Sequence, residues 1–323
     1  MRKLLQRCGA IALLAFAATG GALAADAYPA KPIHLVIPFP PGGAVDIVGR
    51  VVAPKLSAAL GQPVVVDNRA GANGTIGVDF VTKAKPDGYT MLLSALGAIT
   101  IIPHAQKVGY DPLADLVPVT QAVSLTLAWV AKPTHPQVTF ADVVKAAQGG
   151  KAMTAGTSGI GSPNHLAIEQ LNKMAGTHIT HIPYRGEGPA LSDLLGGQID
   201  LVVTTVVAAA PFLKSGQIVA LAQGGTTRAD SLPNVPTVAE AGIKGYEADA
   251  WQGFFLPAKT PAPIVERLQA ELAKILHDPQ TQAFLKERGT DPVGNSSQEF
   301  ATHVRSESER YGQLAKAIDL KMQ

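Results

Sequence analysis

Glycine-rich turns carry the residues of this chain that could do chemistry, and the chemistry they suggest is capture of an anion. The first turn reads Pro38-Phe39-Pro40-Pro41-Gly42-Gly43-Ala44-Val45-Asp46 and lies between an apolar strand pattern and a helix pattern. The first N–H groups of a helix have no partner inside it, so they attract negative charge. Glycine has no Cβ, which lets a ligand approach the backbone. A purely structural connector is the alternative.

A second turn is a stronger candidate. It reads Thr157-Ser158-Gly159-Ile160-Gly161-Ser162-Pro163 and again joins a strand pattern to a helix pattern. Ser162 suits the N-cap position and Pro163 the first helical position. We therefore expect several unsatisfied N–H donors and a partial positive charge beside the hydroxyls of Thr157 and Ser158. A carboxylate would match these donors, and a well-capped helix without a ligand is the alternative.

A third turn, Asp67-Asn68-Arg69-Ala70-Gly71-Ala72-Asn73-Gly74, has the same position between a strand and a helix pattern. Asn68 and Asn73 can fix the turn through the backbone or reach a ligand, and for Asn68 the structural use is favoured. Arg69 could grip a carboxylate, but an exposed pair with Asp67 is the simpler interpretation.

Nucleophilic catalysis fits the sequence less well. The Gly156-x-Ser158 step resembles a nucleophile elbow, but Ile160 stands where the motif G-x-S-x-G needs glycine. A serine hydrolase using Ser158 or Ser162 stays a weaker alternative. His165 is the nearby histidine, and we expect it to support the start of the helix. We therefore predict no catalytic residue.

The composition restricts the class of protein further. Residues 1–25 combine a positively charged start, a short apolar run and small residues at a cleavage point, which predicts a signal peptide, with an uncleaved anchor helix as the alternative. The one cysteine, Cys8, lies in this segment, so the mature chain needs no disulfide. The 27 basic and 25 acidic residues nearly balance, which argues against nucleic-acid binding. No Walker lysine motif occurs and the histidines are scattered, so we expect no cofactor and no metal.

Apolar strand patterns alternate with helical patterns along the mature chain, which indicates an α/β fold with parallel strands. The chain is long for one hydrophobic core, so we expect two lobes, with a ligand in the crevice beyond the carboxyl ends of the strands. Pro54 should kink or divide the first helix. The expected strands lie at 33–38, 63–66, 89–93, 125–131, 153–156, 178–182, 201–205 and 218–222, and the main helices at 46–60, 75–84, 140–147, 163–174, 189–195, 263–277 and 300–320.

These turns, together with other motifs in the same order, resemble one family. The chain is similar to the Bug-type (TctC-like) extracytoplasmic solute receptors of tripartite tricarboxylate transporters over essentially the whole mature sequence. Besides the three turns, the matching segments are Pro86-Asp87-Gly88-Tyr89-Thr90, Tyr110-Asp111-Pro112, Ser162-Pro163-Asn164-His165-Leu166, Ile182-Pro183-Tyr184-Arg185-Gly186, Asp193-Leu194-Leu195-Gly196-Gly197-Gln198-Ile199-Asp200, Pro233-Asn234-Val235-Pro236-Thr237-Val238-Ala239-Glu240-Ala241-Gly242 and Trp251-Gln252-Gly253.

The resemblance implies a two-lobe periplasmic binding protein of type II, a Venus flytrap, in which each lobe is a mainly parallel sheet flanked by helices. Lobe 1 would comprise 26–123 and the returning helices of 236–323, and lobe 2 would comprise 124–235. The implied ligand is a small carboxylate, and the implied partner is the membrane permease of the transporter. We further expect a monomer in the periplasm. The implied ligand-binding residues are Phe39, Pro41, Gly42, Gly43, Ala44, Asp46, Asn73, Gly74, Ser94, Thr157, Ser158, Gly161, Ser162, His165, Tyr184, Thr204, Thr205 and Trp251.

One segment departs from the family pattern. Many relatives carry Phe-Asp-Asn after the Gly-Gln-x-Asp step, where this chain has Val202-Val203-Thr204-Thr205. An acidic group that could contact an amino group is therefore missing there. We hypothesise a dicarboxylate or an aromatic acid rather than an amino acid, and the apolar stretch 94–98 favours a less polar ligand. A sensory receptor that presents its closed form to a signalling partner is the alternative to transport.

Overall fold

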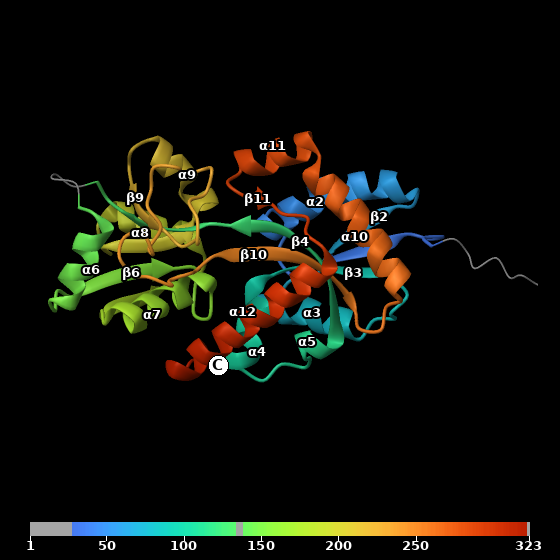
Figure 1. Ribbon diagram of the computed structural model, residues 1–323, viewed down its shortest axis with the longest axis horizontal. Helices are drawn as coiled ribbons and strands as arrows, with labels where there is room; N and C mark the ends of the chain where they lie inside the picture. The colour runs from blue at the N-terminus through green and yellow to red at the C-terminus, as the bar shows by residue number, and fades with distance from the viewer. Residues whose placement is uncertain (1–27, 134–137, 322–323) are drawn as a thin grey trace, which may run out of the picture.

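The computed structural model describes residues 28–133 and 138–321, so the expected signal peptide lies outside the described residues. Two sheets with helices on their faces form two lobes, which lie side by side along the long axis of the molecule (Figure 1). This arrangement confirms the expected two-lobe α/β fold. In the described ranges, no helix is both long and apolar enough to cross a membrane.

Lobe 1 contains the six-stranded sheet found in the described residues, with strand order β11-β4-β10-β3-β1-β2. Its two faces are covered by helices, because its strands carry buried apolar side chains on both sides. The strands are β1 (Ile33–Ile37), β2 (Val64–Asn68), β3 (Thr90–Ala95), β4 (Leu116–Leu125), β10 (Ala250–Pro257) and β11 (Asp291–Pro292). The helices are α2 (Ala44–Leu60), η1 (Ala72–Gly74), α3 (Thr75–Thr82), η2 (Gly97–Ile101), α4 (Ile102–Ala105), α5 (Pro112–Asp115), α10 (Ala262–His277), α11 (Pro279–Glu287) and α12 (Ser297–Ala317).

Helix α2 passes through Pro54 without a break, so the expected division of this helix is wrong. Val48, Val52 and Leu56 recur at helical spacing and are buried in the core between α2 and the sheet. Their burial stabilises the helix on both sides of the proline and offsets the one hydrogen bond that proline cannot donate.

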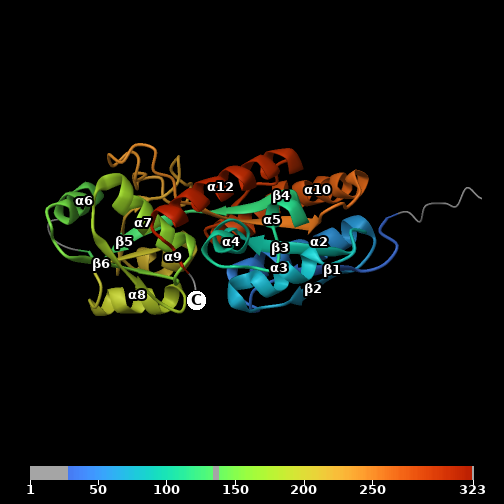
Figure 2. The ribbon, with the colours of Figure 1, turned by 90° about the horizontal axis from the view of Figure 1, so that it is seen from below.

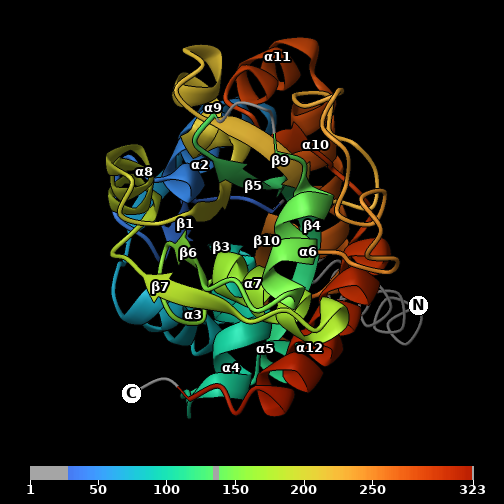
Figure 3. The same ribbon diagram turned by 90° about the vertical axis from the view of Figure 1, so that its left-hand side faces the viewer.

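Lobe 2 contains a five-stranded sheet with strand order β7-β6-β8-β5-β9. Helices α6 and α7 pack on one face, and α8 and α9 pack on the other, as the end-on view in Figure 3 shows. The strands are β5 (Leu127–Ala131), β6 (Met153–Thr157), β7 (Ile179–Pro183), β8 (Leu201–Thr205) and β9 (Val219–Gln223), and the helices are α6 (Phe140–Gln148), α7 (Pro163–Ala175), α8 (Glu187–Gly196) and α9 (Val206–Lys214).

Both sheets are mainly parallel but include antiparallel strands. Strands β1, β2 and β3 are parallel, as are β6, β7 and β8. Strands β10 and β5, by contrast, pair antiparallel with their neighbours. The antiparallel strands lie where the chain crosses between the lobes. The chain enters lobe 2 on β5 and returns to lobe 1 on β10, so each of these strands runs opposite to its neighbours.

Between residues 28 and 321, two crossings connect the lobes in the part of the chain that the structure describes. Thr126 alone separates β4 from β5. After β9, residues 224–249 stay with lobe 2, because Val238, Tyr246 and Ala248 lie in its core. The return to lobe 1 therefore occurs near residue 249, later than the boundary at 235 expected from the sequence. Helix α12 also joins the lobes, running along both of them (Figure 2), and its Arg310 donates to Gln170 of α7 at 3.2 Å.

Candidate ligand-binding site

The strand directions place the glycine-rich turns of the two lobes opposite each other. Strand β10 is antiparallel to both β3 and β4, so β4 runs in the same direction as β3 and its parallel neighbour β1. Strand β4 leads directly into lobe 2. The carboxyl ends of β1, β2 and β3 therefore lie at the edge of lobe 1 nearest lobe 2. In lobe 2, β8 is antiparallel to β5 and parallel to β6, so these carboxyl ends point back toward lobe 1.

Packing between the lobes supports this orientation. Leu166, in the first turns of α7, belongs to the same buried cluster as Trp251 and Phe300 of lobe 1. Val207, at the start of α9, packs against the other core of lobe 1. Both helices of lobe 2 thus begin beside lobe 1, and the turns that precede them lie at the boundary between the lobes.

The first turn of lobe 1 is held by Asp46, a residue of the helix that follows it. The Gly42 N–H donates to Oδ2 of Asp46 at 2.8 Å, and Nδ2 of Asn68 donates to its Oδ1 at 2.9 Å. Arg50 forms an ion pair with Asp46 at 2.7 Å. Burial raises the pKa of Asp46, but the bonds from Arg50, Gly42 and Asn68 outweigh burial and leave the pKa below its usual range. Asp46 shapes the turn, and protein groups occupy both of its oxygens.

The N-terminus of α2 remains open. Its N-cap is Gly43, which makes no side-chain capping bond. Among the described residues, the N–H groups of Ala44, Val45 and Asp46 have no acceptor. Gly42 has a φ of +82°, a left-handed conformation that glycine adopts without strain. The start of α2 can therefore receive an anion through free backbone donors and the helix dipole.

Apolar groups border this open helix end. A Cβ added to Gly74 would lie 3.1 Å from Cζ of Phe39 and 3.3 Å from Cβ of Ala98, so both side chains pack against this glycine. Asn73 beside it is exposed and has a φ of +53°. The turn before α3 thus contributes close backbone packing on Phe39 rather than an added cation.

The remaining polar residues of that turn have structural partners. Nδ2 of Asn68 donates to the carbonyl of Phe39 at 3.1 Å, which is the structural use that the sequence favoured. Nε of Arg69 donates to Oδ2 of Asp67 at 2.7 Å, and both side chains are substantially exposed. The simpler interpretation of each residue is confirmed.

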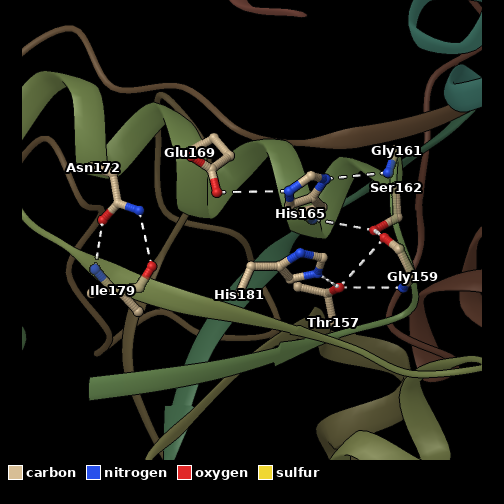
Figure 4. A network of polar contacts seen from close by, with 9 residues as sticks. All are labelled: Thr157, Gly159, Gly161, Ser162, His165, Glu169, Asn172, Ile179 and His181. Carbon is tan, nitrogen blue, oxygen red and sulfur yellow. Dashed lines mark hydrogen bonds and ion pairs between the residues drawn. The ribbon is translucent and has the colours of Figure 1, made fainter. Parts of the chain in front are cut away.

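In lobe 2 the turn before α7 rests on two stacked histidines (Figure 4). The Gly161 N–H donates to Nδ1 of His165 at 3.2 Å. The rings of His165 and His181 stack with centroids 3.9 Å apart, and Nε2 of His181 lies 2.6 Å from Oγ1 of Thr157. Burial and, second, the neighbouring His165 lower the pKa of His181 to about 4. His181 is therefore neutral near pH 7 and supports the turn without adding positive charge.

The start of α7 satisfies most of its own donors, so the expected set of free N–H groups is wrong. Oγ of Ser162 accepts from the His165 N–H at 3.2 Å, and Pro163 has no N–H. The Gly161 N–H is used by His165. Among the described residues, only the Asn164 N–H of this first turn lacks an acceptor. The two lobes consequently differ, since α2 is open and α7 is capped.

Neither serine of this turn is prepared for nucleophilic attack. Oγ of Ser158 donates to Oδ1 of Asn164 at 3.2 Å, and Oγ of Ser162 donates to the carbonyl of Gly159 at 2.7 Å. Within residues 28–133 and 138–321, neither hydroxyl bonds to an imidazole, and no cluster of side chains could hold a metal ion.

Sequence reasoning missed Glu187, the first residue of α8. Its Oε1 accepts from Nδ2 of Asn164 at 2.9 Å and from the Thr205 N–H at 2.7 Å, and its Oε2 accepts from Oγ1 of Thr205 at 2.7 Å. From residues 202–205 we expected no acidic group at the end of β8. That expectation is wrong, because Glu187 of α8 places a carboxylate beside Thr205, the last residue of β8. Its position after Arg185-Gly186, in a turn that follows a strand, was the available signal.

Other expected ligand residues point into the protein. Ser94 and Thr204 are fully buried. The Tyr184 hydroxyl donates to Asp193 at 2.7 Å, and burial followed by this bond raises the pKa of Tyr184 to about 12. Trp251 is buried against Phe300, with ring centroids 5.3 Å apart. Pro41, by contrast, is exposed beside the open end of α2.

Two hollows of the described surface lie away from these turns. One of about 620 Å³ lies between α4 and the end of α12, and one of about 1090 Å³ lies at the outer end of lobe 2 beside α6. None of the expected ligand residues lines either hollow.

Two mixed α/β lobes with strand-to-helix turns at their boundary define a solute-binding receptor of the periplasmic binding protein type. The chain belongs to the family described as "Tripartite tricarboxylate transporter family receptor", which matches residues 48–320. This family consists of substrate-binding receptors, so the chain is a receptor and not an enzyme.

Sequence and structure comparisons agree on this family. A protein encoded in the tcbD-tcbE intergenic region of a Pseudomonas species is 38% identical over 291 residues, 90% of this chain and 87% of the relative. BugT of Bordetella pertussis is 34% identical and covers 95% and 96% of the two chains. Rpa4515 of R. palustris, solved with adipate, is 33% identical with a TM-score of 0.79, over 91% and 99%. MatC of Rhodopseudomonas palustris, with bound malate, is 29% identical with a TM-score of 0.75, over 89% and 99%.

Proposed function

We propose that this chain is an exported receptor that captures a small carboxylate between its lobes and delivers it to the permease of a tripartite transporter. Support for the ligand class comes from two structural neighbours that hold adipate and malate. Support for export comes from residues 1–25, whose pattern is typical of a signal peptide. The proposed receptor acts as a monomer in the periplasm.

The observation that carries this proposal is the open N-terminus of α2. Three consecutive N–H groups that find no acceptor in residues 28–133 and 138–321, together with an uncapped glycine, offer donors at the positive end of a 17-residue helix. A carboxylate bound there gains hydrogen bonds without a cation, which keeps binding reversible. Phe39 and Ala98 add apolar surface beside it. Among small carboxylates, aliphatic and aromatic organic acids are the leading ligand classes.

Binding and lobe movement form one equilibrium in this proposal. A ligand that contacts α2 and also the lobe 2 turns stabilises the closed arrangement by its extra contacts there. The crossing points at Thr126 and near Asp249 are the positions where the lobes can change their angle, because few chain segments connect the lobes there.

A thermal-shift screen of the mature chain tests the proposal. Mono-, di- and tricarboxylates, aromatic acids and amino acids are compared at equal ionic strength, and a ligand at 100 times its Kd should add about 2.7 kcal/mol of stability. We expect at least one organic acid to raise the melting temperature more than any amino acid does. A screen in which no organic acid raises it, while the protein is folded, would contradict carboxylate capture.

A further inference from the structure

We propose that Glu187 is a built-in anion that fills the carboxylate position of lobe 2, so that this receptor takes ligands with a single carboxylate and an apolar body. The inference rests on the proposed function and narrows its ligand class. It places the ligand carboxylate at α2 and the rest of the ligand toward lobe 2.

The partners of Glu187 form a site suited to a carboxylate. Asn164 Nδ2 donates to Oε1 at 2.9 Å, and the backbone N–H and hydroxyl of Thr205 donate to Oε1 and Oε2, each at 2.7 Å. These donors come from the starts of α7 and α9, at the edge of the sheet that faces lobe 1. A ligand carboxylate reaching lobe 2 would need the same donors, and the side chain of Glu187 already occupies them.

Within the described part of the chain, the carboxylate of Glu187 has no ion-pair partner. Among the described residues, no Lys, Arg or His forms an ion pair with this carboxylate. Asp46 at the other turn differs, because Arg50 lies 2.7 Å from it. The positive ends of the α8 and α9 dipoles stabilise the Glu187 carboxylate, so they are no longer available to a carboxylate of the ligand. A second ligand carboxylate would meet an unpaired negative charge in a site partly shielded from water, where repulsion is strong.

The turn before α7 does not offset this charge. Gly161 and His165 donate their N–H groups within the turn, and the low pKa of His181 keeps its ring neutral near pH 7. Ile160, at the tip of the turn, is 50% exposed, and Ile76 at the start of α3 in lobe 1 is 55% exposed. Together with Phe39, these side chains favour an apolar ligand body between the turns.

Matched acids of equal length provide the test. Binding of hexanoate and adipate, and of benzoate and terephthalate, is measured by calorimetry at constant ionic strength on the mature chain. We expect the parent to bind each monoacid about tenfold more tightly than the matching diacid, the preference that one close like charge produces. Glu187→Ala, which vacates the donors, should raise the ratio of diacid to monoacid affinity about tenfold, and the isosteric Glu187→Gln should raise it less.

Glu266→Gln, an exposed change of the same charge on α10, is the matched control and should leave the ratio unchanged. A parent that binds adipate or terephthalate as tightly as the monoacid overturns the inference, as does a ratio that does not move in Glu187→Gln. If both Glu187 variants unfold, binding to the parent is measured again in 0.5 M NaCl. Salt screens the charge of Glu187, so the preference for the monoacid should weaken, and an unchanged preference overturns the inference. A parent that binds no acid at all contradicts the proposed function instead.

Discussion

The Gly161 N–H donates to Nδ1 of His165 across 3.2 Å, so a residue in the first turn of α7 reaches back and holds the turn that precedes it. Lobe 1 uses the same spacing, since the Gly42 N–H donates to Asp46 at 2.8 Å. In each lobe an acceptor four residues on fixes the glycine-rich turn. Both turns are thereby ordered before a ligand arrives, which reduces the entropy that binding must remove.

Asp46→Ala should weaken both the fold and ligand binding. The substitution leaves the Gly42 N–H and Asn68 without their acceptor, and we expect a loss of about 1–3 kcal/mol of unfolding free energy. Urea denaturation measures the loss, and calorimetry with the best acid from the screen measures affinity. Asp67→Ala, which removes only the exposed pair with Arg69, is the control and should cost under about 0.5 kcal/mol. Equal losses in the two variants would contradict the role given to Asp46.

His181 should make the parent less stable in mild acid. The folded state lowers the pKa of His181 from 6.5 to about 4, so its contribution is present above pH 6.5 and is lost as the pH falls toward 4. In the parent, the free energy of unfolding should therefore be lower at pH 4.5 than at pH 7. Allowing for the partial exposure of His181, we expect this difference to be about 1–2 kcal/mol smaller in His181→Gln. Denaturant unfolding at pH 7, 5.5 and 4.5 provides the values. The exposed His178→Gln is the control, and an unchanged pH profile in His181→Gln would refute this reading.

Asp249, at the return crossing, should act in the opposite direction. Burial, and second the charge of Glu247, raises the pKa of Asp249 to about 7, and its Oδ1 is buried without a partner among the described residues. The protonated carboxyl of Asp249 is favoured in the folded state, so its contribution to the free energy of unfolding is fully present below pH 4 and is lost as the pH rises through 7. We expect Asp249→Asn to be about 1–2 kcal/mol more stable than the parent at pH 8. The same comparison at pH 4 is the control, where the difference should shrink, and a variant less stable at pH 8 would count against this view.

Ser162→Ala separates a capping role from a catalytic one. Loss of the bond from the His165 N–H should cost about 1 kcal/mol, as for other serine N-caps. Ser192→Ala, an exposed change within α8, should cost under about 0.5 kcal/mol. Denaturation of both variants measures the difference. The parent should not hydrolyse activated esters, and hydrolysis that disappears in Ser162→Ala would revive the hydrolase alternative.

The sequence by itself determined the local features. The alternation of strand and helix patterns, the turns before 44, 75 and 163, the N-cap at Ser162 and the pair of Arg69 with Asp67 all depend on residues close together in the chain. The ordered motifs also identified the family, because their spacing is a property of the sequence alone.

Only the tertiary structure decided which of these groups remain available to a ligand. Glu187 meets Thr205 and Asn164 across 18 and 23 residues, and His181 meets Thr157 across 24. No local pattern encodes such contacts, because they arise when separate strands align in one sheet. The same is true of the strand directions that bring the starts of α2 and α7 to one boundary. A helix start whose sequence predicts an anion site can bind an anion only where no acceptor of the protein itself satisfies its free N–H groups.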